Sequence, residues 1–246
     1  MPTLIRCVRS DFQKFRHTSM LWIHILIPLA AAVLFVGYYS VSPWNAEAKI
    51  SGYFEVIGAA FPLMIGLISG KSVEQERQSG NFQTMLCGVK SRSAAYTSKL
   101  IVLLMPGIIA IAIAIGVFAT GFQTAPGVIY VKAAGLLIAG SVFPYILHLF
   151  ISLRFGRGAS IGLGIVESLI SALALTGLGD RGWYYIPCTW SARLCDCLVS
   201  IWINPSQAIG YAEIEKCMTV AIPATIAAFL ISLLWFQRWD GSRSNE

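Results

Sequence analysis

The stretch LIVLLMPGIIAIAIAIGVFATG, from Leu100 to Gly121, decides the fold class, because it carries no charged residue. A helix rises about 1.5 Å per residue, so a run of this length crosses the roughly 30 Å hydrocarbon core of a bilayer. Over its 246 residues the chain is 56% apolar and only 12% charged, against about 25% charged residues in an ordinary soluble domain. A water-soluble protein of this length cannot bury so much apolar surface, so the sequence predicts a membrane protein.

Five further runs have the same apolar character. The six predicted spans are Ser19–Tyr39, Gly52–Ser69, Leu100–Gly121, Ala133–Leu153, Ala159–Gly177 and Met218–Phe236. Each run is continuously apolar, whereas the strands of a membrane barrel alternate apolar and polar residues over about 10 positions. We therefore expect an all-α protein with one six-span domain over residues 1–246.

The positive charges predict the orientation. Thirteen lysines and arginines fall on the side that holds both termini, and five fall on the other side. Because cytoplasmic segments carry an excess of such residues, we expect both termini in the cytoplasm and a multi-pass protein of the cell membrane. The net charge of +6 then reflects this asymmetry and does not indicate nucleic-acid binding.

Residues 1–18 predict a short amphipathic helix on the cytoplasmic leaflet. An apolar arc of about 100° excludes the four cations of this segment. The arc consists of Leu4, Ile5, Val8, Phe12 and Phe15, and the cations are Arg6, Arg9, Lys14 and Arg16. The helix is either an elbow that couples movement of the bundle to the membrane plane or a plain anchor.

The predicted cytoplasmic segment 70–99 is too long for a simple turn. After Gly80, a short helix carries Phe82, Met85 and Leu86 on one side. An exposed apolar face on a short helix favours docking into a groove of a partner protein. The alternative is that this helix lies on the bilayer.

The nearby sequence Gly66-Leu-Ile-Ser-Gly70-Lys71-Ser72 resembles a phosphate-binding loop only superficially. That motif needs four residues between its glycines, and here there are three, at the end of a predicted membrane helix. We therefore expect no ATP binding by this chain. Gly66-x-x-x-Gly70 and Gly158-x-x-x-Gly162 are better interpreted as small-residue packing faces.

Four ionisable side chains fall inside the predicted spans: His24, Glu55, His148 and Glu167. A charged group at the centre of a bilayer costs about 2.5–3.5 kcal/mol on insertion scales, so these groups should face the interior of the bundle. They form either a polar path for a cationic substrate or a proton relay. The alternative is that the glutamic acids are buried, neutral and hydrogen-bonded.

The predicted extracellular segment 178–217 is rich in aromatic residues. We expect short helices that dip into the outer leaflet and cover the exit of a path, with Trp183, Pro187, Trp190 and Arg193 as exit-loop residues. The alternative is an aromatic belt at the headgroup level. Four cysteines here allow three disulfide pairings or remain free thiols, and without a nearby histidine they do not predict a metal site. These are Cys188, Cys195, Cys197 and Cys217.

Several of these features together carry a resemblance to a known family. The order Glu76-x-x-x-Gly80, a short helix 82–86, Ser91-Arg92, then Tyr96 and Lys99 into the next span resembles the coupling-helix region of six-span ABC exporter permeases. Within that class, the chain length, the segment Trp183–Arg193 and the ending Phe236-Gln-Arg-Trp239-Asp are similar to the MutG-like permeases of lantibiotic immunity and resistance.

The resemblance implies a permease subunit that pairs with a second permease, different or identical, and with a cytoplasmic ABC ATPase dimer. The complex would lie in a bacterial cytoplasmic membrane and would remove cationic lantibiotic-type peptides from it. ATP and Mg²⁺ would bind the ATPase, so this chain would hold no cofactor or metal and would not be an enzyme. The implied ATPase contacts are Glu76, Gly80, Phe82, Met85 and Leu86.

Other functions remain open beside this one. An ABC permease for another peptide, a lipid or a drug would share these features. An ion-coupled secondary transporter is a further alternative, although the fifth predicted span lacks the interruptions typical of that class. An intramembrane hydrolase using His148 and Glu167 is disfavoured, because the sequence holds no His-Glu-x-x-His motif.

Overall fold

The computed structural model describes residues 2–16, 18–88, 90–206 and 208–241, which form helices and no strand. The elements are α1 (Pro2–Arg16), α2 (Ser19–Val41), α3 (Ala46–Gln78), α4 (Gln83–Leu86), α5 (Arg92–Gly121), α6 (Gly127–Phe155), α7 (Arg157–Ala174), the 3₁₀ turns η1 (Trp183–Tyr185) and η2 (Pro187–Thr189), α8 (Trp190–Ile203) and α9 (Ala208–Arg238).

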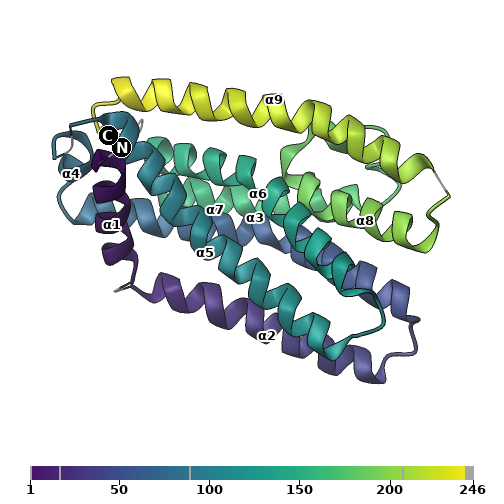
Figure 1. The fold of residues 1–246 in the computed structure, drawn as a ribbon. Helices are drawn as coiled ribbons and strands as arrows, with labels where there is room; N and C mark the ends of the chain where they lie inside the picture. The colour runs from purple at the N-terminus through teal and green to yellow at the C-terminus, as the bar shows by residue number, and fades with distance from the viewer. Residues whose placement is uncertain (1, 17, 89, 207, 242–246) are drawn as a thin grey trace.

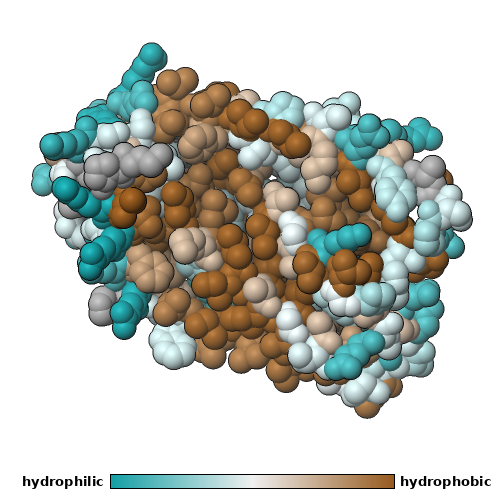
Figure 2. Space-filling model, in the orientation of Figure 1, coloured by the Kyte–Doolittle hydropathy of each residue, from teal (hydrophilic) through white to brown (hydrophobic). Residues whose placement is uncertain are grey.

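Six of these helices are long and apolar enough to cross a membrane, which confirms the predicted fold class. They are α2, α3, α5, α6, α7 and α9. The long helices run side by side along one direction (Figure 1). Apolar side chains gather over the middle of the bundle and hydrophilic ones at its two ends (Figure 2). We call these the α1 end, where α1 and α4 lie, and the α8 end.

The two predicted long loops are largely helical, which corrects their boundaries. Helix α3 continues to Gln78 and α5 begins at Arg92, so Glu76 lies within α3. Ser91 is the N-cap of α5, because its Oγ accepts a hydrogen bond from the backbone N–H of Ala94. In the segment 178–217, α8 and nearly three turns of α9 replace most of the loop.

Glycines allow α3 to lie against its neighbours at backbone distance. A Cβ added at Gly66 would come within 2.6 Å of the Ser160 carbonyl oxygen, and one at Gly58 would come within 2.6 Å of the Ala192 Cα. The predicted packing role of Gly66 is therefore confirmed. Gly158 and Gly162 differ, since a Cβ at either would meet nothing within 4 Å.

Helix α1 crosses the end of the bundle instead of running along it (Figure 1). Its side chains divide between two environments: Cys7 and Phe15 are buried against the bundle, and Ile5 and Phe12 are 67% and 42% exposed. A helix with one apolar edge directed outward and one edge packed on the protein suits the boundary between lipid and water.

Candidate functional site

A buried cluster of charges ties α1 to α3 and α5. The Lys14 ammonium donates to both carboxylate oxygens of Glu76, at 3.1 and 2.9 Å, and the Lys99 ammonium donates to Glu76 Oε1 at 2.7 Å. Lys99 also lies 3.6 Å from Asp11 Oδ1, and the Ser98 hydroxyl donates to Asp11 Oδ2 at 2.6 Å. The Glu76 and Lys99 side chains are only 1% and 4% exposed.

Glu76 lies inside the chain and not at an accessible surface. Glu76 was expected at a surface that contacts an ATPase, but its carboxylate is covered by α1 and neutralised within the chain. Buried charges are tolerated only when paired and hydrogen-bonded. The sequence reasoning missed the roles of Asp11 and Lys14, although their spacing of three residues places both on one face of α1.

The α4 segment, residues 79–91, is also anchored within the chain. Gly80, Asn81 and Phe82 have φ values of 145°, 45° and 65°, and this left-handed turn directs the Phe82 ring inward. The ring is 1% exposed and lies 5.0 Å, centroid to centroid, from the Trp239 ring. The expectation that Phe82 and Met85 form an exposed face is therefore wrong, since Met85 is 5% exposed.

Arg92 completes the link between this segment and the end of α9. Its Nη1 donates to the backbone carbonyls of Gln237 and Trp239, at 3.0 and 2.9 Å. These carbonyls lie at the negative end of the helix dipole, where a cation is favourable. Of the α4 residues named from the sequence, Gly80 is exposed and Leu86 is half-buried. Gln83 and Cys87 are the neighbouring exposed side chains.

Inside the bundle, a hydrogen-bonded chain joins α6, α7 and α3. His148 Nε2 lies 2.8 Å from Glu167 Oε2, and His148 Nδ1 lies 2.9 Å from Ser160 Oγ. The Ser160 hydroxyl donates to the Gly66 carbonyl at 3.0 Å. A hydroxyl has one hydrogen, so Ser160 must accept from His148 Nδ1–H. His148 Nε2 and Glu167 therefore share a single proton between them.

The structure brings together only two of the four predicted intramembrane groups. Glu55 accepts a hydrogen bond from Ser51 at 2.7 Å, and His24 Nδ1 contacts the Met20 carbonyl at 2.7 Å. Neither takes part in the His148–Glu167 pair. The four residues thus do not form one continuous polar path within this subunit.

Two substitutions of Glu167 separate the effect of its charge from the effect of its hydrogen bond to His148. In Glu167→Gln the amide donates to His148 Nε2, so we expect a loss of less than about 1 kcal/mol in the free energy of unfolding. Glu167→Leu leaves the buried Nε2 unpaired, which costs about 1–3 kcal/mol. Thermal unfolding in detergent measures both, and an equal loss in the two variants would contradict the shared-proton geometry.

At the α8 end, the predicted exit-loop aromatic residues lie in the interior. Trp183 and Trp190 are at most 1% exposed, and each indole N–H has a partner, Glu213 Oε2 at 3.2 Å and the Tyr184 carbonyl at 2.9 Å. Arg193 lies 5.6 Å from the Trp183 ring and pairs with Asp180 and Asp196. The expectation of an aromatic exit surface is wrong for both tryptophans, while Pro187 is half-buried.

All six cysteines lie in the described part of the chain, and all are free thiols. Cys87 is exposed and the other five are buried. Burial raises the pKa of the Cys188 and Cys197 thiols, each to about 12. A thiol that stays protonated is a poor nucleophile, so thiol reagents should select Cys87. Among the described residues, no three histidine, cysteine or acidic side chains are grouped to hold a metal ion.

Comparison with known families gives a match over about two thirds of the chain. The family model described as ABC-2 family transporter protein matches residues 7–171. This range contains α1 from Cys7 onward, the charge cluster, the α4 segment and the His148–Glu167 pair. No curated protein matches the chain.

Proposed function

The chain belongs to the ABC-2 transporter family, and from this premise we propose that it is the permease of an ATP-driven exporter of cationic, lantibiotic-type peptides. Membership of the family makes the chain a multi-pass membrane subunit of an ABC transporter. The proposed coupling to ATP hydrolysis rests on the structure of the α4 segment. This segment is a short helix held at the bundle end by the buried Phe82, with Gln83 and Cys87 exposed beside it.

The proposed ATPase contact therefore differs from the set implied by the resemblance. Gly80, Gln83, Leu86 and Cys87 supply the accessible surface, while Phe82, Met85 and Glu76 support it from behind. The excess of lysine and arginine at the α1 end favours a cytoplasmic location for this surface. The ATPase subunit would bring ATP and Mg²⁺.

The exposed face of α7 supports the proposed pairing with a second permease. Gly158 and Gly162 are open on this face, followed by Ile165 and Leu169, which are 47% and 61% exposed. Small residues allow close approach between helices in a membrane. The lantibiotic substrate rests on the resemblance of the segment Trp183–Arg193 and of the ending Phe236–Asp240 to the immunity permeases.

Co-purification tests the proposal directly. We expect the chain, tagged after residue 246 and extracted gently from its native membrane, to bring down an ABC ATPase subunit. In that complex a polar maleimide should label Cys87 slowly, and removal of the ATPase should speed the labelling. Labelling with an unchanged rate would contradict the α4 contact.

Recovery of the chain alone would overturn the ATP-driven function and favour an ion-coupled transporter, in which the His148–Glu167 pair carries the proton. The substrate has its own test. A strain lacking the chain should become more sensitive to a cationic lantibiotic, and the wild-type chain should restore resistance. Unchanged sensitivity would contradict a lantibiotic as the substrate, but it would not contradict the assignment of the chain as an ABC permease.

A further inference from the structure

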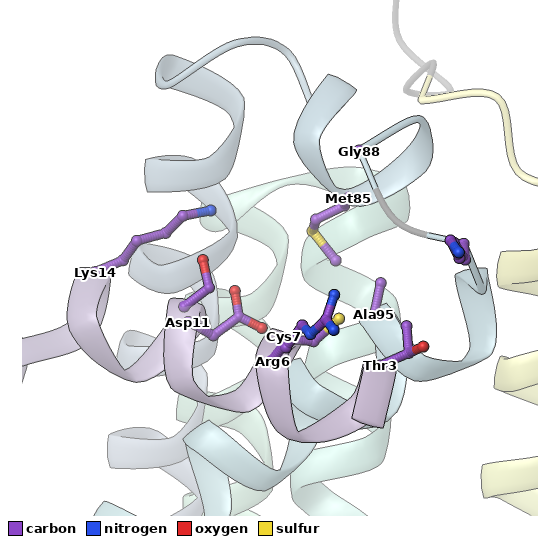
Figure 3. A pocket seen from close by; sticks show the side chains of 10 residues that line it. Thr3, Arg6, Cys7, Asp11, Lys14, Met85, Gly88 and Ala95 are labelled. Carbon is purple, nitrogen blue, oxygen red and sulfur yellow. The ribbon is translucent and has the colours of Figure 1, made fainter. Parts of the chain in front are cut away.

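A pocket of about 380 Å³ lies between α1 and the residues that link α4 to α5. Figure 3 shows Arg6, Cys7 and Asp11 of α1 on one side and Met85 and Ala95 on the other. The pocket adjoins the charge cluster, since Asp11 and Lys14 belong to both. It is therefore placed where α1 meets the coupling segment.

Some of the charged side chains that line this pocket form ion pairs, and others do not. Asp11 is held by Ser98 and Lys99, and Lys14 is bonded to Glu76. Arg6 and Lys90 also line the pocket, both are exposed, and neither forms an ion pair within the described residues. Two cations that form no ion pair within the described residues, one from α1 and one from the residues before α5, thus line the same pocket.

The residue types point to the chemistry of a ligand. A guanidinium binds phosphate through two parallel N–H bonds, and a lysine ammonium adds a point charge. Thr3 and Ser10 contribute hydroxyl groups to the lining. Ile5 and Phe12 are exposed on another side of α1, which places the helix at the headgroup level of the membrane.

We propose that this pocket binds a phosphate group, which joins Arg6 of α1 to Lys90 of the coupling segment. The phosphate belongs either to an anionic lipid or to a soluble phosphate compound, since both present the same tetrahedral anion. Occupancy would fix α1 against the segment that precedes α5 and so stabilise their contact. This binding does not depend on the proposed substrate or on an ATPase, and it is measured on the chain alone.

The test compares the purified chain with two double variants. Arg6→Gln/Lys90→Gln removes the two lining cations that form no ion pair within the described residues, and Arg9→Gln/Arg16→Gln removes two exposed cations of α1 that do not line the pocket. Thermal unfolding is followed in detergent with increasing inorganic phosphate at constant ionic strength. A second series uses lipid nanodiscs of phosphatidylcholine with or without phosphatidylglycerol. The midpoint without ligand shows that each variant folds.

Saturable stabilisation of the wild type and the control by inorganic phosphate, with affinity at least tenfold weaker in Arg6→Gln/Lys90→Gln, supports a soluble phosphate ligand. Stabilisation by phosphatidylglycerol only, lost in the same variant and kept in the control, supports a lipid headgroup. Absence of stabilisation in both series overturns the proposal. An equal loss in the two double variants also overturns it, because it would show an unspecific effect of positive charge.

Discussion

Replacing Glu76 with glutamine is expected to destabilise the chain severely. The substitution leaves the Lys99 ammonium, 4% exposed, beside a neutral amide, and Asp11 at 3.6 Å is its other carboxylate neighbour. Removing one partner of a buried ion pair costs about 3–5 kcal/mol. The total stability of a folded domain is only about 5–15 kcal/mol. We therefore expect a large fall in the thermal midpoint in detergent and a low yield of folded protein.

Glu74 supplies the matched control for this experiment. It lies two residues earlier on α3 and pairs with Arg77, whose side chain is 41% exposed. This pair is partly exposed, since the Glu74 side chain itself is 16% exposed. Partly exposed ion pairs contribute less than buried ones, so Glu74→Gln should shift the midpoint much less than Glu76→Gln. Glu76→Leu/Lys99→Leu removes both buried charges together and should recover part of the loss. Equal midpoints for Glu76→Gln and Glu74→Gln would contradict the buried cluster.

Replacing Phe82 with alanine is expected to uncouple the α4 segment while the six spans stay folded. Truncation of a buried phenylalanine costs about 3–5 kcal/mol. Since α4 has only 4 residues, the loss falls on this segment. At about 3 kcal/mol the ratio of docked to undocked segment drops roughly a hundredfold. Under the proposed function, peptide export should then fall at least tenfold while the ATPase still hydrolyses ATP.

The control for this variant is Gln83→Ala, which changes the exposed residue next to Phe82. It should keep the resistance of the segment 79–91 to limited proteolysis, whereas Phe82→Ala should make this segment the first cleavage site. Export at the wild-type level by Phe82→Ala would contradict a supporting role for the ring. Loss of the whole chain from the membrane would show that Phe82 stabilises more than α4.

The six spans could be predicted from the sequence because hydropathy is a local property of each run. The ends of the helices could not, since α3 extends beyond its apolar part through Glu74 and Glu76. The ion pairs of Glu76 stabilise this extension, and their partners are distant in sequence: Lys14 lies 62 residues before Glu76. No sequence pattern within α3 itself predicts such a contact.

For the candidate site as well, the sequence identified important residues but not the contacts that they make. The sequence identified the apolar face of Phe82 and Met85 as one that something must cover, but it does not say what covers it. Here Trp239 of the same chain lies against Phe82. His148 and Glu167 were both identified as costly in lipid, and the direct contact between them required the antiparallel packing of α6 and α7.

The contact between Phe82 and Trp239 also has a consequence for biosynthesis. Trp239 is translated 157 residues after Phe82, which at about 5–20 residues per second is a delay of roughly 8–30 s. During that interval the aromatic ring lacks the Trp239 partner that it has in the finished fold. A chain truncated before residue 239 would therefore lack the Trp239 ring that lies against Phe82 in the finished fold.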